Sequence, residues 1–166
     1  EFLDMFRRGD MILLVVDVTT DPAGQLEKSV AFLEEHRIVP LHLKHKYESV
    51  PRVLTILPFL VLASKCDDQS LDENVEIMRE LIEDHWSVVP VSAKTGRNLK
   101  EMAESLPEHL GIIRIYSKRR GKPADMDEPF VLHRGSTIDD LAAKVHKEIA
   151  GQLRGAKVWG HNVFDG

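Results

Sequence analysis

Residues 11–17 read Met-Ile-Leu-Leu-Val-Val-Asp, and residues 59–67 read Phe-Leu-Val-Leu-Ala-Ser-Lys-Cys-Asp. Each stretch opens with an unbroken apolar run that shows no alternation, which is typical of a strand buried on both faces of a parallel sheet. A third run, Val88 to Val91, has the same character. A loop that contains Pro40 and Pro51 precedes the second run. The three runs therefore predict three parallel strands.

Helical patterns separate these predicted strands. Residues 22–37 carry apolar side chains at i, i+4 and i+7, behind a proline that suits the first turn of a helix. Ser70 and Glu73 form the capping pattern of a second helix, and Asn98 and Glu101 repeat it for a third. Strands and helices that alternate in this way are the signature of an α/β sheet with right-handed crossovers.

The pattern changes after residue 110. Apolar and polar side chains alternate over residues 113–118, which predicts a half-buried strand, and residues 130–133 predict a second. A helix is expected over residues 137–150, capped by Ser136 or Thr137, and residues 157–159 begin another strand. This order predicts a small α+β module of the β-grasp type. We therefore expect two domains, residues 1–110 and residues 111–166.

Composition excludes several protein classes. The chain has 166 residues, of which 43% are apolar and 30% charged, so it is not a disordered chain. Its single cysteine excludes a disulfide scaffold and fits a reducing, cytoplasmic setting. No apolar run reaches the roughly 20 residues that cross a bilayer, so we expect no membrane partner.

Charge is divided unevenly along the chain. Residues 1–110 carry 12 basic and 20 acidic side chains, whereas residues 111–166 carry 10 and 7. The basic part could contact phosphates, or its charge could be ordinary solvated surface.

The tetrapeptide Ser64-Lys65-Cys66-Asp67 follows a predicted strand directly. It resembles the N-K-x-D motif with which GTP-binding proteins read guanine. A carboxylate such as that of Asp67 can accept both the ring N–H and the exocyclic amino group of guanine, a contact that adenine cannot offer. The methylene stem of Lys65 would lie along the base. Taken alone, the tetrapeptide could equally be a solvated turn after a strand.

A second motif, Ser92-Ala93-Lys94, follows the next predicted strand. It resembles the S-A-K motif whose backbone N–H contacts the guanine O6 in the same proteins. Both motifs occur in the expected order at the carboxyl ends of parallel strands, where α/β sheets bind ligands. The pair favours guanine recognition, and the predicted site residues are Ser64, Lys65, Asp67, Ser92, Ala93 and Lys94.

The phosphate-binding half of such a site has no counterpart in these residues. The sequence contains no G-x-x-x-x-G-K-[ST] phosphate loop and no D-x-x-G motif for magnesium and the γ-phosphate. The apolar strand at 11–16 also expects neighbours on both sides, and a three-stranded sheet would leave apolar surface in water. We therefore expect a fragment of a longer protein, with residues that precede Glu1.

Two sets of segments carry a resemblance to known families. The first set comprises Phe2-Leu-Asp-Met-Phe-Arg-Arg-Gly-Asp10, Leu13-Leu-Val-Val-Asp17, Gln25-Leu-Glu27, Ser64-Lys-Cys-Asp67 and Ser92-Ala-Lys94. It resembles the second half of an Obg-related GTPase domain, in the branch of the developmentally regulated GTP-binding proteins. The second set comprises Ile113-Arg-Ile-Tyr-Ser-Lys118, Gly121-Lys-Pro123, Asp127-Glu-Pro-Phe130, Arg134-Gly-Ser-Thr137, Asp140-Leu141, Val145-His-Lys-Glu148 and Lys157-Val-Trp-Gly160. It resembles the TGS domain, a β-grasp module shared by threonyl-tRNA synthetases, this GTPase branch and SpoT-type enzymes.

The resemblance implies a fold and a function. The fold would be the carboxyl-terminal half of a parallel P-loop GTPase sheet, followed by a ubiquitin-like TGS domain truncated at its end. GTP or GDP would be the ligand, with Mg²⁺ bound and GTP hydrolysed in the full-length parent rather than by residues of this chain. The TGS domain would dock a ribosome, an RNA or a protein partner. An alternative is a non-enzymatic adaptor with a degenerate GTPase domain, because Ser64 stands where the family has Asn.

The best nucleic-acid candidate is the loop Lys118-Arg119-Arg120-Gly121-Lys122. Its four cations could contact RNA phosphates, or the loop could be a solvated turn. The eight histidines show no spacing that suits a metal ligand set, so we expect no metal site. We expect both tryptophans, Trp86 and Trp159, to lie in cores.

Overall fold

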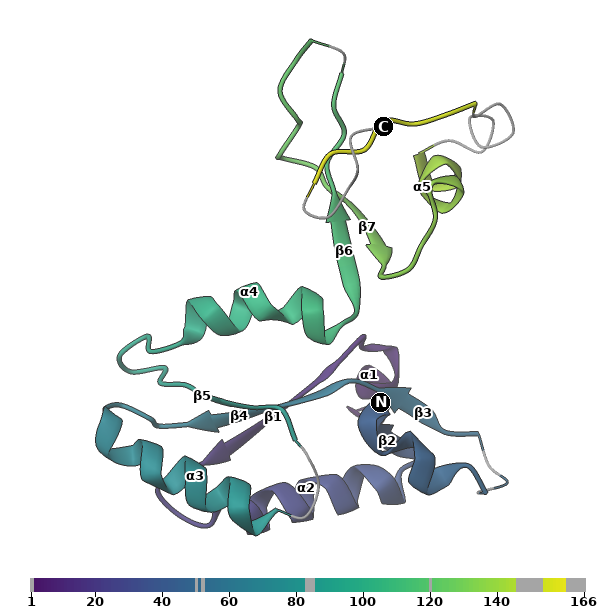
Figure 1. The fold of residues 1–166 in the computed structure, drawn as a ribbon. Helices are drawn as coiled ribbons and strands as arrows, with labels where there is room; N and C mark the ends of the chain where they lie inside the picture. The colour runs from purple at the N-terminus through teal and green to yellow at the C-terminus, as the bar shows by residue number, and fades with distance from the viewer. Residues whose placement is uncertain are drawn as a thin grey trace. The chain divides into compact units, whose positions relative to one another are not determined.

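The computed structural model describes residues 2–49, 51, 53–82, 86–119, 121–145 and 154–160. The chain divides into two compact units, Glu1–Leu110 and Gly111–Gly166 (Figure 1). Within the described residues, no helix is long and apolar enough to span a membrane.

The first unit is built on a three-stranded parallel sheet with the order β1-β4-β5. The strands are β1 (Ile12–Asp17), β4 (Phe59–Ser64) and β5 (Val88–Pro90). β1 and β4 are paired in register, so that Asp17 lies opposite Ser64. The predicted parallel α/β sheet is confirmed, and the ends of β1 and β4 lie side by side at the carboxyl edge.

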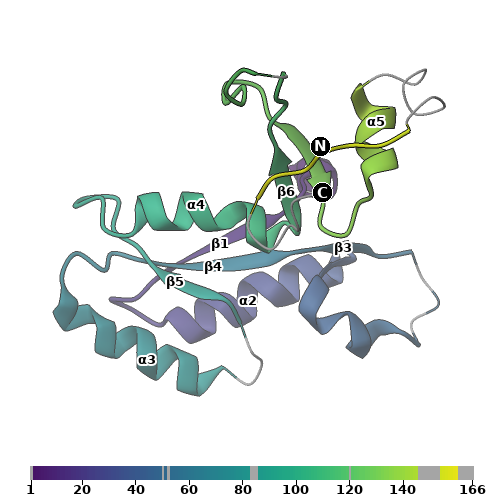
Figure 2. The ribbon, with the colours of Figure 1, turned by 45° about the horizontal axis from the view of Figure 1, so that its top comes forward.

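Helices cover both faces of this sheet (Figure 2). On one face, α2 (Pro22–Glu35) and α3 (Asp72–Leu81) bury their apolar stripes against the strands. On the other face, α4 (Leu99–His109) packs Met102 and Leu106 onto β4 and β5. The buried side chains that join the sheet to α2 and α3 are Val16, Leu26, Val61, Ala63, Val75 and Met78.

β1 is not buried on both faces in this chain, and the apolar surface that a three-stranded sheet is expected to leave in water is present. Leu13 is 42% exposed and Val15 is 64% exposed. Within the described residues, β1 pairs with β4 alone. Because α4 packs over β4 and β5, the face of β1 that carries Leu13 and Val15 stays in water.

Two helix starts differ from the predicted caps. A 3-10 turn, η2 (Gln69–Leu71), precedes α3, and the carboxylate of Asp68 accepts from the backbone N–H of Ser70 at 2.8 Å. Asn98 has a left-handed φ of 57°, and its amide donates to the carbonyl of Pro90 at 2.8 Å instead of capping α4. At α2, Pro22 lies in the first turn as expected, and the structure adds a cap, because the Asp21 carboxylate accepts from the N–H of Gly24.

Further elements occupy segments without a predicted element. The chain opens with α1 (Phe2–Arg8). The expected proline-bearing loop contains a second, two-stranded parallel sheet of β2 (Ile38–Pro40) and β3 (Thr55–Leu57), with the 3-10 helix η1 (Leu41–Tyr47) between them. β2 is fully buried, and this burial stabilises a strand too short to show a pattern in the sequence.

The second unit contains a two-stranded antiparallel sheet and a helix: β6 (Ile112–Ile115), β7 (Phe130–His133) and α5 (Ile138–Val145). Thr137 caps α5 as predicted, since its hydroxyl accepts from the N–H of Asp140 at 3.2 Å. The predicted continuation of this helix over 146–150 lies outside the described residues. Residues 157–159 form no strand, which corrects the expected third strand.

Candidate functional site

The six residues predicted to read guanine lie in two loops at the carboxyl edge of the first unit's sheet. Residues 64–67 leave β4, and residues 92–94 leave the end of β5. The loops are joined by a backbone hydrogen bond from Cys66 to Val91 at 3.1 Å. The edge of the parallel sheet therefore brings the two motifs together.

Asp67 and Ser92 are in direct contact. The hydroxyl of Ser92, which is fully buried, donates to Oδ1 of Asp67 at 2.7 Å, and accepts from the N–H of Thr95 at 3.1 Å. The hydrogen bond from Ser92 is the main reason that the pKa of Asp67 is lowered. Asp67 is therefore an anchored, ionised carboxylate at neutral pH.

Lys94 contacts the other oxygen of the same carboxylate. Its Nζ lies 3.3 Å from Oδ2 of Asp67, and its side chain is 81% exposed. An exposed ion pair of this kind contributes little to stability, so Lys94 can leave the carboxylate at small cost. Ala93, between Ser92 and Lys94, is exposed in the turn.

Lys65 and Ser64 are directed toward β1. Lys65 has a left-handed φ of 66°, and its Nζ lies 2.5 Å from Oδ2 of Asp17. The hydroxyl of Ser64 donates to the carbonyl of Val16 at 2.7 Å. The side chains of Ser64 and Lys65 therefore both bind to the end of β1.

Asp17 was not among the predicted site residues. In addition to Lys65, it accepts from the N–H and the hydroxyl of Thr19 at 2.9 and 2.6 Å. The hydrogen bond from Lys65, followed by those from Thr19, lowers the pKa of Asp17 from 3.8 to about 2. Its position in the sequence could have indicated a site residue, because Asp17 ends an apolar run just as Ser64 does.

Arg97 is a second residue that sequence reasoning missed. Its guanidinium donates to the carbonyl of Asp68 at 2.9 Å and to the carboxylate of Asp72 at 2.8 Å. The same group lies 3.4 Å from the carbonyl of Cys66, and it lowers the pKa of Asp72. Arg97 thus holds the two loops together. No local motif in the sequence indicates this role.

Cys66 is a structural residue between Lys65 and Asp67. It is fully buried, and its thiol donates to the carbonyl of Ala63 at 3.3 Å. Burial raises the pKa of the Cys66 thiol, so its thiolate is disfavoured. No cluster of His, Cys, Asp or Glu within the described residues could hold a metal ion.

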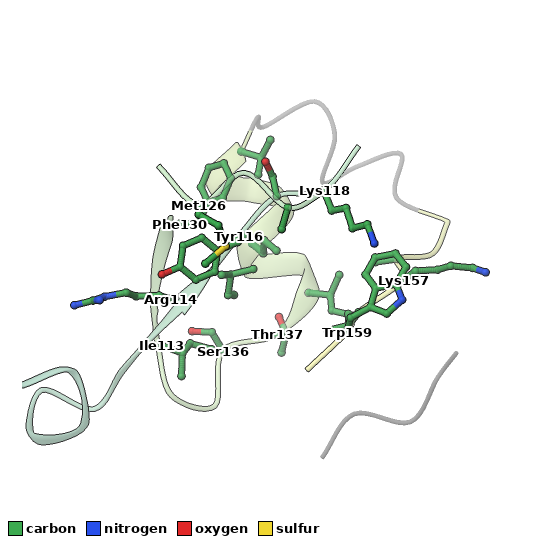
Figure 3. A pocket seen from close by; sticks show the side chains of 18 residues that line it. Ile113, Arg114, Tyr116, Lys118, Met126, Phe130, Ser136, Thr137, Lys157 and Trp159 are labelled. Atoms are coloured by element: carbon green, nitrogen blue, oxygen red, sulfur yellow. The ribbon is translucent and has the colours of Figure 1, made fainter. Parts of the chain in front are cut away.

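The basic loop lies in the second unit. Lys118, Arg119 and Lys122 are all exposed, and Arg120 lies outside the described residues. Lys118 Nζ lies 4.8 Å from the ring centre of Trp159, whose side chain is 58% exposed (Figure 3). The expectation that Trp159 lies in a core is therefore wrong, whereas Trp86 packs against two buried clusters of the first unit.

Comparison with known proteins finds one domain family and several relatives. Residues 113–164 match the TGS domain. The chain is 38% identical over 107 residues to an uncharacterized GTP-binding protein of Methanocaldococcus jannaschii, covering 64% of this chain and 27% of the relative. It is 32% identical over 108 residues to an uncharacterized GTP-binding protein of Schizosaccharomyces pombe, covering 64% of this chain and 28% of the relative.

The human developmentally-regulated GTP-binding protein 2 is 29% identical over 104 residues, which is 63% of this chain and 27% of that relative. The matched region thus spans about a quarter of the length of these relatives. The chain contains a TGS domain and is homologous to developmentally regulated GTP-binding proteins, so the predicted resemblance is confirmed.

Proposed function

We propose that this TGS-containing homologue of developmentally regulated GTP-binding proteins reads the base of a guanine nucleotide with its 64–67 and 92–94 loops. The observation that carries the proposal is the 2.7 Å hydrogen bond from the buried Ser92 to Asp67. It joins the two predicted motifs and fixes an ionised carboxylate at the carboxyl edge of a parallel sheet, where such sheets bind ligands.

The geometry suits the Watson–Crick edge of guanine. An ionised carboxylate has about four acceptor sites, so Asp67 can keep its bond to Ser92 and still accept two N–H groups. Lys94 would move aside, since it is exposed and 3.3 Å from Oδ2. In the proposed complex, the backbone N–H of Ala93 donates to the guanine O6.

The stem of Lys65 would cover one face of the base. Its ammonium is held by Asp17 at 2.5 Å, which limits where the four methylene groups can lie. Asp17 is therefore proposed as a positioning residue for Lys65, not as a group that touches the nucleotide.

Binding of GTP or GDP with Mg²⁺, and hydrolysis of GTP, are proposed for the whole protein. Within residues 1–166 we assign no residue to the phosphates or the metal, because the sequence shows neither of the corresponding motifs. Phosphate and metal contacts supply most of the affinity in such sites, whereas the loops described above supply the choice of base. We place this protein in the cytoplasm, in keeping with its single, buried cysteine.

Base selection can be tested on the chain as it stands, by following backbone amide signals in NMR spectra during titration with GMP and with AMP. We expect GMP to shift the signals of Lys65, Asp67 and Ala93, and AMP to leave them in place. Asp67→Asn should abolish the GMP response, whereas Asp10→Asn, an exposed change in the same unit, should keep it. Equal responses to the two nucleotides would show that the carboxyl edge of this sheet does not select guanine.

A second candidate function is that of a non-enzymatic adaptor. The observation that favours it is the bond from the Ser64 hydroxyl to the Val16 carbonyl, which commits Ser64 to β1. Ser64→Asn separates the two functions. A tighter GMP titration in the variant would show that Ser64 impairs the guanine site, as the adaptor requires. No gain, or a loss, would show that the loop has formed around Ser64 and would favour guanine reading.

Docking of RNA or a ribosome is proposed for the second unit, through Lys118, Arg119, Arg120 and Lys122. Replacing Arg119, Arg120 and Lys122 by Ala should weaken binding to unrelated RNAs about equally, because phosphate contacts carry no sequence information. The log–log salt slope should fall by about 0.7 for each lost contact to a single strand. An intact variant with unchanged affinity and slope would point to a protein partner instead.

A further inference from the structure

Trp159 is a large aromatic side chain left 58% exposed among cations. It lines an open depression of about 630 Å³, together with Lys118, Arg119, Gly121 and Lys157. The described lining contains three cations and no acidic side chain, although Asp125, Asp127 and Glu128 follow in the sequence. The depression therefore combines a flat aromatic surface with positive charge.

Two of the three cations, Lys118 and Arg119, lie on a hydrogen-bonded turn. Lys118 pairs with Ala124 in an antiparallel bridge, and the N–H of Asp125 donates to the carbonyl of Ser117 at 2.8 Å. Lys122 donates its N–H to the carbonyl of Arg119 at 3.1 Å, and Gly121 has a φ of 74° that other residues rarely adopt. The turn therefore fixes the backbone from which Lys118 and Arg119 project.

Trp159 also borders a second recess of its unit. Besides the basic depression, Trp159 lines an apolar cavity of about 580 Å³, whose walls include Ile113, Phe130 and Leu141. Figure 3 shows Trp159 beside Lys118 and Lys157 at the rim of this cavity. The ring thus borders an apolar and a basic recess, and its exposed surface is open to a ligand.

We propose that this depression is a binding site for single-stranded RNA, in which an unpaired base stacks on Trp159 and the flanking phosphates contact Lys118, Arg119 and Lys157. Aromatic rings beside cations are the usual means by which proteins hold single strands, whereas the bases of a duplex are stacked on one another and unavailable. The ammonium of Lys118 lies over the ring, so this aromatic surface already attracts a cation. In the proposed complex, the base would take the place of Lys118 on the ring, and Lys118 would move to the adjoining phosphate. This inference rests on the RNA docking proposed above and specifies the ligand.

The first test uses the unmodified chain. It contains two tryptophans, and hence two indole N–H signals in an NMR spectrum, which Trp159→Phe assigns. Titration with a twelve-nucleotide oligouridine should shift the Trp159 signal and leave that of Trp86 in place. A twelve-base-pair RNA duplex and inorganic polyphosphate should not shift the Trp159 signal in the same way, because neither offers an unpaired base.

The second test uses variants. Trp159→Ala should weaken oligouridine binding about 5- to 150-fold, the range that loss of one stacked base produces. Trp159→Phe should retain most of the affinity, and it guards against a failure of Trp159→Ala to fold, which circular dichroism would reveal. Lys157→Ala should weaken binding and flatten the salt dependence, whereas Arg134→Ala, an exposed cation of the same unit outside the depression, should not.

The outcomes separate this inference from the docking on which it rests. If oligouridine and duplex bind equally well and Trp159→Ala changes neither affinity, stacking on Trp159 is wrong while phosphate-based docking stands. If no RNA binds to the intact chain at millimolar concentration, both proposals fail for RNA. If polyphosphate reproduces the Trp159 shift, the depression is a site for phosphate alone, and the inference is overturned.

Discussion

At the residue scale, the two contacts of Asp67 have different characters. Ser92 is fully buried and holds Oδ1 at 2.7 Å, whereas Lys94 is 81% exposed and lies 3.3 Å from Oδ2. The buried contact is part of the folded loop, and the exposed one is screened by water and salt. A ligand that donates two N–H groups therefore competes with Lys94 and leaves Ser92 in place.

Asp67→Asn should shift the preference of the proposed site from guanine toward xanthine. The amide replaces one acceptor by a donor, and xanthine offers a carbonyl where guanine has its amino group. We expect the ratio of GMP to XMP affinity, measured by NMR titration of the chain, to fall roughly tenfold or more, in keeping with 1–3 kcal/mol for an unpaired polar group. If the ratio stays constant, Asp67 does not contact the base.

The pKa of Asp17 predicts a change of stability with pH. Because the hydrogen bonds from Lys65 and Thr19 lower this pKa from 3.8 to about 2, the folded state binds its proton more weakly than the unfolded state. The resulting stabilisation is complete above the unfolded value and is lost as pH falls from about 4 to about 2. Urea unfolding at pH 7 and at pH 2.5 measures the loss.

In Asp17→Asn the loss between these two pH values should be smaller than in the unmodified chain. Asp10→Asn, a substitution at an exposed position of the same unit, serves as the control and should lose as much as the unmodified chain. Identical losses in all three proteins would show that the Asp17–Lys65 pair does not form in solution.

At the scale of elements, β1 has one buried and one exposed side. Val16 is 1% exposed and packs against α2 and α3, whereas Val15, its neighbour, is 64% exposed. This difference follows from the alternation of side chains along a strand and from the position of α4 over β4 and β5. The described fold therefore buries only part of the apolar run at 11–16.

Two neighbouring substitutions test this asymmetry. Val16→Thr should lower the free energy of unfolding by about 1–3 kcal/mol, because it buries a hydroxyl group. Val15→Thr should change it by less than about 0.5 kcal/mol, as is usual for exposed positions. Urea titrations of both variants make the comparison, and equal losses would show that Val15 is covered in solution.

At the scale of the whole molecule, two units carry two different candidate sites. The first unit, Glu1–Leu110, has a net charge of −8 and holds the proposed guanine site, whereas the second, Gly111–Gly166, has a net charge of +3 and holds the basic depression. Nucleotide and RNA binding can therefore be measured separately.

The 166-residue chain should bind GTP with a Kd weaker than about 1 μM, which corresponds to about −8 kcal/mol. The reason is that its sequence supplies contacts to the base but no recognised phosphate or magnesium motif. Isothermal calorimetry with GTP and Mg²⁺ makes the measurement. A submicromolar Kd would show that phosphate ligands exist in these residues outside the known motifs.

The sequence by itself determined the parallel sheet and the approximate location of the proposed site. Unbroken apolar runs at 11–16, 59–63 and 88–91 specify the strands of a parallel sheet, because helices packed on such a sheet remove apolar surface from water. Parallel strands then bring the residues that follow them to one edge. The meeting of Asp67 with Ser92 follows from that rule.

Only the tertiary structure decided the contacts within that edge. The roles of Arg97 and Asp17 depend on distances between loops that are far apart in the sequence, and no local pattern encodes such distances. Asn98 does not cap α4 as its capping pattern with Glu101 predicted. Its backbone has a left-handed φ, and its amide binds the carbonyl of Pro90 instead. The exposure of Val15 and Trp159 was likewise decided by packing, since hydrophobicity indicates what a side chain prefers and only its neighbours determine whether it is covered.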